Sequence, residues 1–73
     1  MGTIALQMRN ALKQLRLERN WTQKDLASAL DVSRQTVIAI ERGKYAPSLP
    51  LAFRIARVFE LPLEEIFSEE DDS

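Results

Sequence analysis

The chain has 73 residues, enough for one domain, and 45% of them are hydrophobic, as is typical of a globular protein. It contains no cysteine and no histidine, which excludes a disulfide framework and a zinc site built from Cys and His ligands. No apolar run approaches the roughly 18 residues that a membrane-spanning helix needs, and no signal peptide is evident, so we expect a cytoplasmic protein.

The charges are divided unevenly along the chain, although they nearly cancel over its whole length to a formal net charge of −1. Residues 1–59 carry all ten Lys and Arg and only four acids, a net charge of +6, whereas residues 60–73 carry seven acids and no base. Because a phosphate backbone responds to local charge, the near-neutral total does not argue against nucleic-acid binding.

The first predicted element is a helix over residues 4–19, with Thr3 as a candidate N-cap. Leu6 and Leu17 lie on one side of this helix, either as scattered surface residues or as a second contact surface. The other apolar residues recur at helical spacing and form a separate stripe: Ile4, Met8, Ala11, Leu12 and Leu15.

Residues 22–43 are predicted to form two short helices joined by a tight turn at residues 30–32. Thr22 and Ser33 are suited to cap the two helix starts, and Gly43 stands where a helix commonly ends in a left-handed residue. The expected inward-facing residues are Leu26, Ala27 and Leu30 in the first helix and Val37 and Ile40 in the second.

The second of these helices directs a mostly polar face away from its apolar stripe. At 100° per residue, Gln35, Ala39 and Arg42 lie farthest from the stripe, with Ile38 at the edge and Arg34 in the first turn. Arginine and glutamine at the leading end of an exposed helix suit bidentate hydrogen bonds to guanine and adenine edges. A solvated helix face without a ligand is the alternative.

Two more helices follow a loop at residues 44–47. Ser48 is a candidate N-cap for a helix over residues 49–59, and Pro62 begins a short last helix over residues 63–67. The expected core residues of this part are Leu49, Ala52, Ile55, Ala56, Phe59 and Ile66.

The acidic end of the chain has no hydrophobic periodicity. We therefore predict a domain over residues 1–67 and a disordered tail over residues 68–73. The tail either only keeps the chain soluble or folds back on the basic face and weakens non-specific DNA binding.

The segment WTQKDLASALDVSRQTVIAIERGKYAPSLPLAFRIARVFELPLEEIF resembles the DNA-binding domain of the Cro-repressor-like (XRE) helix-turn-helix regulators. The resemblance rests on TQxxLA, VSRQTV, E-x-G and P-S-L in order and covers about two-thirds of the chain. It implies an all-α, compact five-helix fold like that of lambda repressor, which binds double-stranded DNA, usually as a two-fold dimer. The family often begins its first helix near Ala11, so residues 4–10 are an extension.

The resemblance also assigns roles to residues. The base-reading positions are Arg34, Gln35, Ala39 and Ile38. The positions expected to contact the DNA backbone are Thr22, Gln23, Ser33, Thr36, Arg42, Lys44 and Tyr45, although Tyr45 could equally be exposed without a role.

The family pairs an arginine of the first helix with a glutamate late in the recognition helix, here Arg16 and Glu41. A direct contact between Arg16 and DNA is the alternative. Trp21 is expected to pack over the second helix as a hydrophobic staple, with stacking on DNA as its alternative.

Apolar residues beyond the needs of the core are the candidates for a self-complementary dimer interface: Phe53, Val58, Leu63 and Phe67. Leu63 and Phe67 could instead close the bottom of the core.

These patterns predict a transcriptional regulator, a repressor that binds a palindromic operator as a homodimer. An antitoxin-like protein-interaction module, with DNA binding secondary, is the alternative. An enzyme is not expected, because the chain lacks His, Cys and a glycine-rich phosphate loop. We expect no metal, no cofactor and no small-molecule effector domain.

Overall fold

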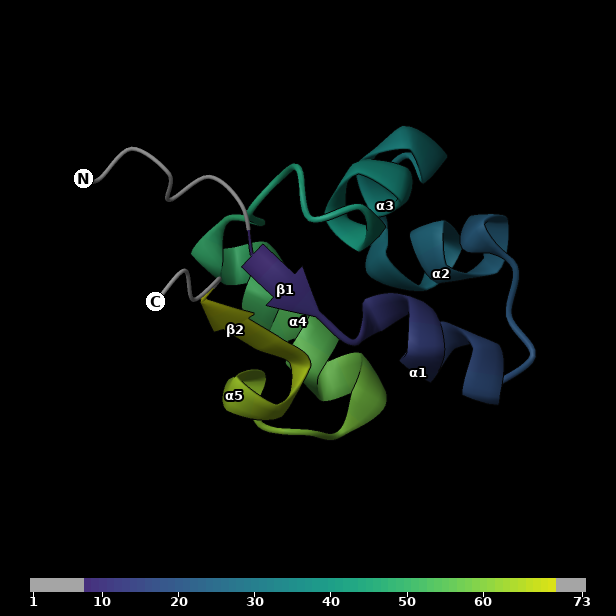
Figure 1. The fold of residues 1–73 in the computed structure, drawn as a ribbon. Coiled ribbons are helices and arrows are strands. Elements are labelled where there is room, and N and C mark those ends of the chain that lie inside the picture. Colours follow the sequence, from purple (N-terminus) through teal and green to yellow (C-terminus); the bar gives the residue numbers. More distant parts are fainter. Residues whose placement is uncertain (1–7, 70–73) are drawn as a thin grey trace.

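The computed structural model describes residues 8–69, which fold into helices and one pair of short strands (Figure 1). The helices of this part are α1 (Leu12–Glu18), α2 (Gln23–Leu30), α3 (Arg34–Glu41), α4 (Leu49–Phe59) and α5 (Leu63–Ile66). Two short strands, β1 (Met8–Asn10) and β2 (Phe67–Glu69), pair at the ends of the described chain. Within residues 8–69, no helix is long and apolar enough to cross a membrane.

One hydrophobic core holds the helices together. Its members come from all five of them: Leu12, Leu26, Ala27, Leu30, Val37, Ile40, Leu51, Ile55, Phe59 and Ile66. Fully burying a Leu, Ile or Val side chain stabilises a fold by about 1.5–3 kcal/mol, so these side chains supply most of the favourable free energy. The predicted apolar stripes of α2 and α3 are confirmed.

Helix α2 begins with a reciprocal capping box. The Thr22 hydroxyl accepts a hydrogen bond from the Asp25 N–H at 3.0 Å, and the Asp25 carboxylate accepts one from the Thr22 N–H at 2.9 Å. The backbone N–H and then the side chain of Thr22 hold the pKa of Asp25 below its ordinary value, because both favour the charged carboxylate. The predicted N-cap is therefore confirmed.

The starts of α3 and α4 are fixed in the same way by serine hydroxyls. Ser33 accepts the N–H of Thr36 at 3.1 Å, and Ser48 accepts that of Leu51 at 3.3 Å. Pro50 lies in the first turn of α4, where its missing N–H removes no helical hydrogen bond.

The turn between α2 and α3 depends on a left-handed residue. Asp31 has φ 59°, and the Val32 N–H donates to the Ala27 carbonyl at 3.0 Å across it. Aspartate tolerates this conformation better than most residues that carry a Cβ. After α3, Gly43 has φ 72°, as predicted for a glycine just beyond a helix.

The first helix is shorter than the predicted one over residues 4–19. Residues 8–10 form β1, and α1 begins only at Leu12. Asn10 explains the late start, because its Oδ1 accepts the Leu12 N–H at 3.1 Å while its Nδ2 donates to the Ile40 carbonyl at 2.8 Å. The prediction for residues 3–7 lies outside the described residues.

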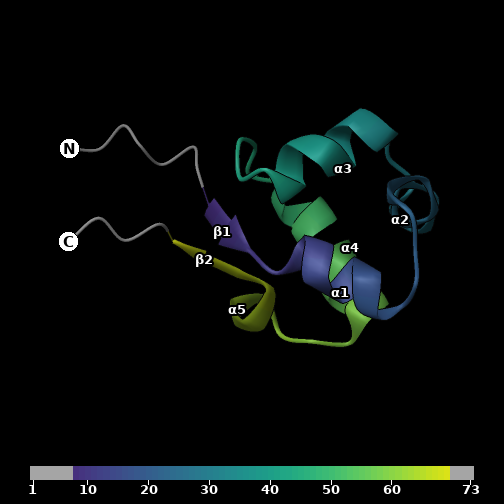
Figure 2. The same ribbon diagram turned by 45° about the vertical axis from the view of Figure 1, so that its right-hand side comes forward.

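The two strands form an antiparallel pair in which Met8 opposes Glu69 and Asn10 opposes Phe67. They lie side by side in both ribbon views (Figures 1 and 2). The last helix therefore ends at Ile66 rather than at residue 67, and residues 68 and 69 are paired rather than disordered. Residues 70–73 lie outside the described part, and the domain boundary stays a prediction.

The predicted core face of α4 contains one error. Leu49 is 62% exposed, whereas Leu51 is buried. Leu49 is the first residue of α4, before the helix passes over the core. Ala52, Ile55 and Phe59 are buried as predicted, and Ala56 is half-buried against the core.

We predict that Asn10→Ala lowers the free energy of unfolding by about 1–3 kcal/mol, because two partly buried hydrogen bonds are lost. Urea unfolding followed by circular dichroism measures the loss. Gln14→Ala is the matched control, since the Gln14 side chain makes only an exposed contact with Glu18. Equal stability of the two variants would contradict this role of Asn10.

Candidate nucleic-acid interface

Helix α3 is anchored on one face and exposed on the other. Val37 and Ile40 are completely buried, while Arg34 and Gln35 are exposed in its first turn. Of the remaining predicted base-reading residues, Ile38 and Ala39 are half-buried. The structure therefore places an arginine and a glutamine together at the N-terminal end of the helix, followed by two less exposed residues.

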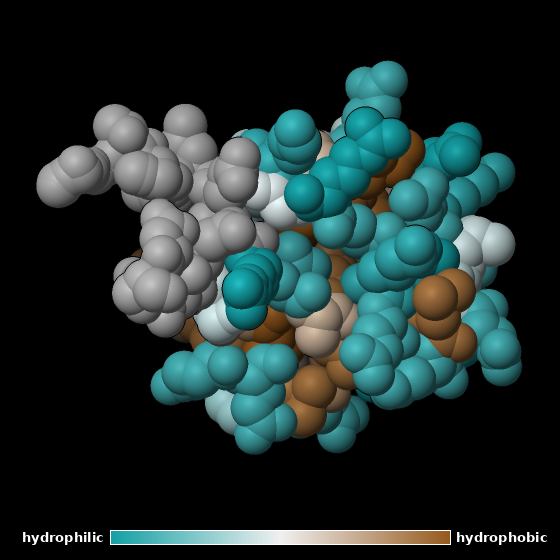
Figure 3. Space-filling model, viewed as in Figure 1, coloured by the Kyte–Doolittle hydropathy of each residue, from teal (hydrophilic) through white to brown (hydrophobic). Residues whose placement is uncertain are grey.

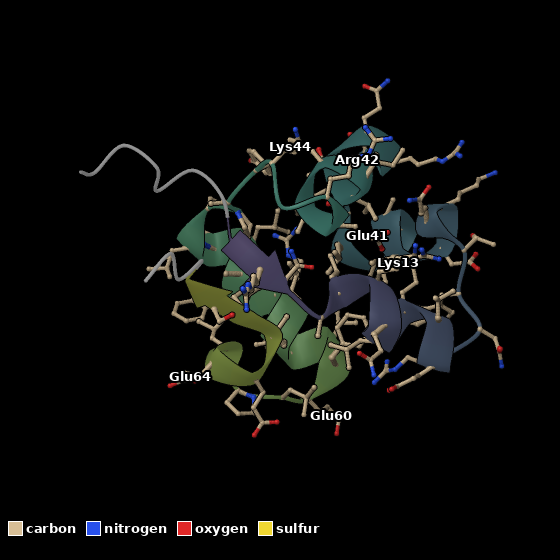
Figure 4. All side chains as sticks on the ribbon, in the orientation of Figure 1. Lys13, Glu41, Arg42, Lys44, Glu60 and Glu64 are labelled. Carbon is tan, nitrogen blue, oxygen red and sulfur yellow. The ribbon has the colours of Figure 1, made fainter. Side chains whose placement is uncertain are left out.

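The far end of α3 and the following loop carry exposed residues that can contact an anion. Arg42 caps the helix, and Lys44 follows Gly43. Both side chains are exposed and cationic, and Tyr45 beside them is 44% exposed. Figure 4 shows Arg42 and Lys44 near each other at the end of α3.

The predicted polar residues at the two helix starts are partly engaged within the protein. The hydroxyls of Ser33 and Thr36 lie 3.0 Å apart and share a hydrogen bond. The amide of Gln23 donates to Glu41 at 3.3 Å. The capping box occupies the Thr22 and Asp25 N–H groups, so the remaining first-turn donors of α2 are the backbone N–H groups of Gln23 and Lys24.

A buried ion pair joins α1 to α3. Arg16 Nε donates to Glu41 Oε2 at 2.7 Å, and Arg16 Nη2 donates to Glu41 Oε1 at 3.2 Å. The two side chains are only 8% and 5% exposed, and Arg16 Nη1 also donates to the Trp21 carbonyl at 2.9 Å. The predicted structural pair is confirmed, and its burial leaves Arg16 little surface for a direct contact with DNA.

Trp21 packs against the core, but its ring partner lies on α4. Its ring centroid is 5.9 Å from that of Phe59, and the Arg19 guanidinium lies over both rings at 5.2 and 4.9 Å. These contacts cover much of the indole from within the same chain.

One basic residue beside α3 was not among the predicted site residues. Lys13 of α1 lines a depression of about 320 Å³, and Figure 4 shows it beside Glu41. Helical spacing could have predicted this position. Lys13 lies one turn before Arg16, the residue expected to reach Glu41, and so shares its side of the helix. The other residues that line the depression are Gln23, Ile38, Glu41 and Arg42.

The candidate dimer residues do not all have the same surroundings. Phe53 is 48% exposed, and Val58 is half-buried against the core. Leu63 and Phe67 are brought together in a largely apolar groove of about 450 Å³. The groove is lined by Pro47, Leu49, Ala52, Leu63, Glu64 and Phe67.

Hydrophilic side chains cover most of the visible surface over α2 and α3, and hydrophobic patches are seen lower in the view (Figure 3). Glu60 and Glu64 lie at the end of the molecule opposite Arg42 and Lys44 (Figure 4). The unequal division of charge along the sequence is thus also a division in space among these residues.

The helix-turn-helix family HTH_3 matches residues 12–66. An uncharacterized HTH-type transcriptional regulator of Methanocaldococcus jannaschii is 60% identical, over 89% of this chain and 98% of the relative. YgzD of Bacillus subtilis, another uncharacterized HTH-type transcriptional regulator, is 41% identical over 90% of this chain and all of its own. The CTXphi transcriptional repressor RstR of Vibrio cholerae is 28% identical, over 82% of this chain and 54% of its own.

The fold also occurs among crystal structures. A protein from Bacteroides fragilis superposes with a TM-score of 0.71 at 23% sequence identity, over 84% of this chain and 98% of its own. The predicted helical fold is confirmed, with the terminal strand pair as an addition to it.

We predict that Glu41→Ala lowers the free energy of unfolding by about 3–5 kcal/mol, because it leaves the Arg16 charge buried without its partner. A loss of that size approaches the whole stability of so small a domain, so the variant should be largely unfolded. The double variant Arg16→Met/Glu41→Leu should be more stable than Glu41→Ala alone, as measured by urea unfolding. The opposite order would show that the isolated charge is not the source of the loss.

Proposed function

The chain belongs to the HTH_3 family of helix-turn-helix DNA-binding transcriptional regulators, and from this premise we propose that it is a repressor that binds an operator as a homodimer. The observation that supports the proposal most directly is the exposure of Arg34 and Gln35 on a helix whose opposite face is completely buried. The relative named as a transcriptional repressor, RstR, adds support for repression rather than activation.

In the proposed complex, α3 enters the major groove with its N-terminal end toward the base edges. Arg34 can donate two hydrogen bonds to guanine, and Gln35 can both donate to and accept from adenine. Ala39 and Ile38 lie farther along the same helix. The small Ala39 permits close approach of the helix to the bases, and apolar side chains at these positions can contact thymine methyl groups.

In the proposed complex, polar groups around α3 bind phosphates of the DNA backbone and so fix the position of the helix in the groove. The backbone N–H groups of Gln23 and Lys24 have no acceptor within α2, lie at the positive end of its dipole and suit a phosphate oxygen. Thr22, Ser33 and Thr36 add hydroxyls near the two helix starts. At and beyond the C-terminal end of α3, three exposed residues are suited to contact the DNA backbone: Arg42, Lys44 and Tyr45.

We propose that two copies associate through the face formed by Phe53 and the groove of Leu49, Leu63 and Phe67. A two-fold interface must be self-complementary. Leu49 lines the groove, and the exposed Phe53 lies one helical turn farther along α4, so both can belong to one apolar face. The two α3 helices would then meet major grooves about 34 Å apart, which calls for an approximately palindromic operator.

The same apolar face supports a second candidate function. Leu49 is 62% and Phe53 48% exposed, and Leu49 lines the apolar groove. An unrelated protein could occupy this face, as in an antitoxin-like module that binds both a partner and DNA. The oligomeric state of the isolated chain distinguishes the two candidates.

Selection from a random duplex library at two salt concentrations tests the proposed readout. We expect the parent chain to enrich a palindromic motif and to bind less tightly at higher salt. Arg34→Ala should cost about 1–3 kcal/mol of specific binding and relax one base position in each half-site, whereas Lys44→Ala should weaken all sequences alike. An unchanged motif for Arg34→Ala would show that Arg34 does not read a base.

Sedimentation equilibrium tests the proposed dimer face. We expect the parent chain to be a dimer and Phe53→Glu to be a monomer, because a carboxylate would be buried at the interface. Leu17→Glu is the matched control, since Leu17 is a 53% exposed apolar residue of α1 outside the groove. Dissociation by Leu17→Glu but not by Phe53→Glu would place the interface elsewhere. A monomeric parent that co-purifies with another protein at fixed ratio would favour the antitoxin-like candidate.

A further inference from the structure

We propose that Arg57 of each subunit forms an ion pair with Glu64 of the partner subunit, so that two equivalent pairs fix how the two copies are aligned. The inference rests on the proposed homodimer. It names the charged residues by which the dimer face would select a second copy of this chain as its partner.

The exposed side of α4 changes from apolar to cationic along the helix. Leu49, Phe53 and Arg57 follow one another at intervals of four residues, so they share one side of α4 and are spaced about 6 Å apart along its axis. Leu49 is 62% and Phe53 48% exposed, and the Arg57 side chain is exposed as well. A copy of the chain that packs on this side must therefore accommodate an arginine at one end of it.

The opposite charge lies at the other end of the same face. Glu64 lines the apolar groove together with Leu49, and its side chain is exposed. Glu60, which follows α4 three residues after Arg57, lies apart from Glu64 in Figure 4. Neither Arg57 nor Glu64 forms an ion pair with another of residues 8–69. Both charges can therefore pair with a second chain without breaking a pair in their own.

Two-fold symmetry brings the two charges together when the two α4 helices run antiparallel. With the axis beside Phe53, the two Phe53 rings meet, and the residue four positions after Phe53 lies opposite the residue four positions before it in the other chain. The partner subunit's Arg57 then lies over Leu49, at the groove that Glu64 lines. Its methylene groups can cover the apolar side chain while its guanidinium binds the carboxylate.

A parallel arrangement of the two helices is disfavoured by charge. It would place Arg57 against the partner subunit's Arg57 and leave Glu64 at the far end of the face. Like charges that meet at an interface oppose association, whereas opposite charges fix its register. The positions of Arg57 and Glu64 therefore favour the antiparallel alignment.

Charge reversal followed by sedimentation equilibrium of the full chain tests the pairing. We expect Arg57→Glu and Glu64→Arg each to weaken dimerisation by about tenfold, because each replaces two attractive contacts per dimer by two repulsive ones. An equimolar mixture of the two variants should dimerise with about the parental affinity, because both pairs of the mixed dimer again join opposite charges. A chain that carries both reversals should also dimerise like the parent. Mixing could not restore a contact that is made within one chain.

Glu65→Arg is the matched control, since Glu65 is exposed in the same first turn of α5 as Glu64 but does not line the groove. It makes the same change of charge at the same helix end, and we expect it to dimerise like the parent. Circular dichroism checks that every variant is folded.

The outcomes separate this pair from the dimer itself. A dimeric parent whose two charge-reversed variants keep the parental affinity, or stay weak when mixed, would overturn the ion pair and leave the proposed dimer intact. A monomeric parent chain would overturn the dimer and the pair together.

Discussion

The buried pair of Arg16 and Glu41 is the interaction on which the DNA-binding arrangement depends. Two charges in a dry interior are costly unless their remaining hydrogen-bonding groups are satisfied. Here the Trp21 carbonyl and the Gln23 amide complete the set. The network therefore joins α1, the following loop, the start of α2 and the end of α3, and its hydrogen bonds hold these four parts in place relative to one another.

The features that could be predicted from the sequence are those that local chemistry determines. Helix caps and left-handed glycines depend on neighbours within a few residues, so the sequence predicts their positions. Here they are Thr22, Ser33, Ser48 and Gly43. The strand pair could not be predicted in this way, because residues 8–10 pair with residues 67–69, far away in the sequence. The apolar spacing of the first segment is compatible with a helix, and only the contacts of Asn10 explain why the helix begins later.

The candidate site divides in a similar way. Arg34 and Gln35 were recognisable from helix phase and from the resemblance, and the Arg16–Glu41 pair from the resemblance alone. Whether an exposed residue has a neighbour of the same charge depends on tertiary packing. The depression lined by Lys13 and Arg42 and the groove lined by Leu63 and Phe67 are formed by packed helices, so no single stretch of sequence predicts them.

The strand pair at the chain ends has a consequence for the order of folding. Its partners are about sixty residues apart, so pairing them before the helices have packed would bear the full entropic cost of closing the largest loop among the described residues. The pair contains only three residues on each side, so it adds few contacts in return. It should form last, open first, and exchange its amide hydrogens faster than the helices. Because Asn10 belongs to it and its side chain donates to the Ile40 carbonyl, an opening that displaces Asn10 also releases one restraint on the end of α3.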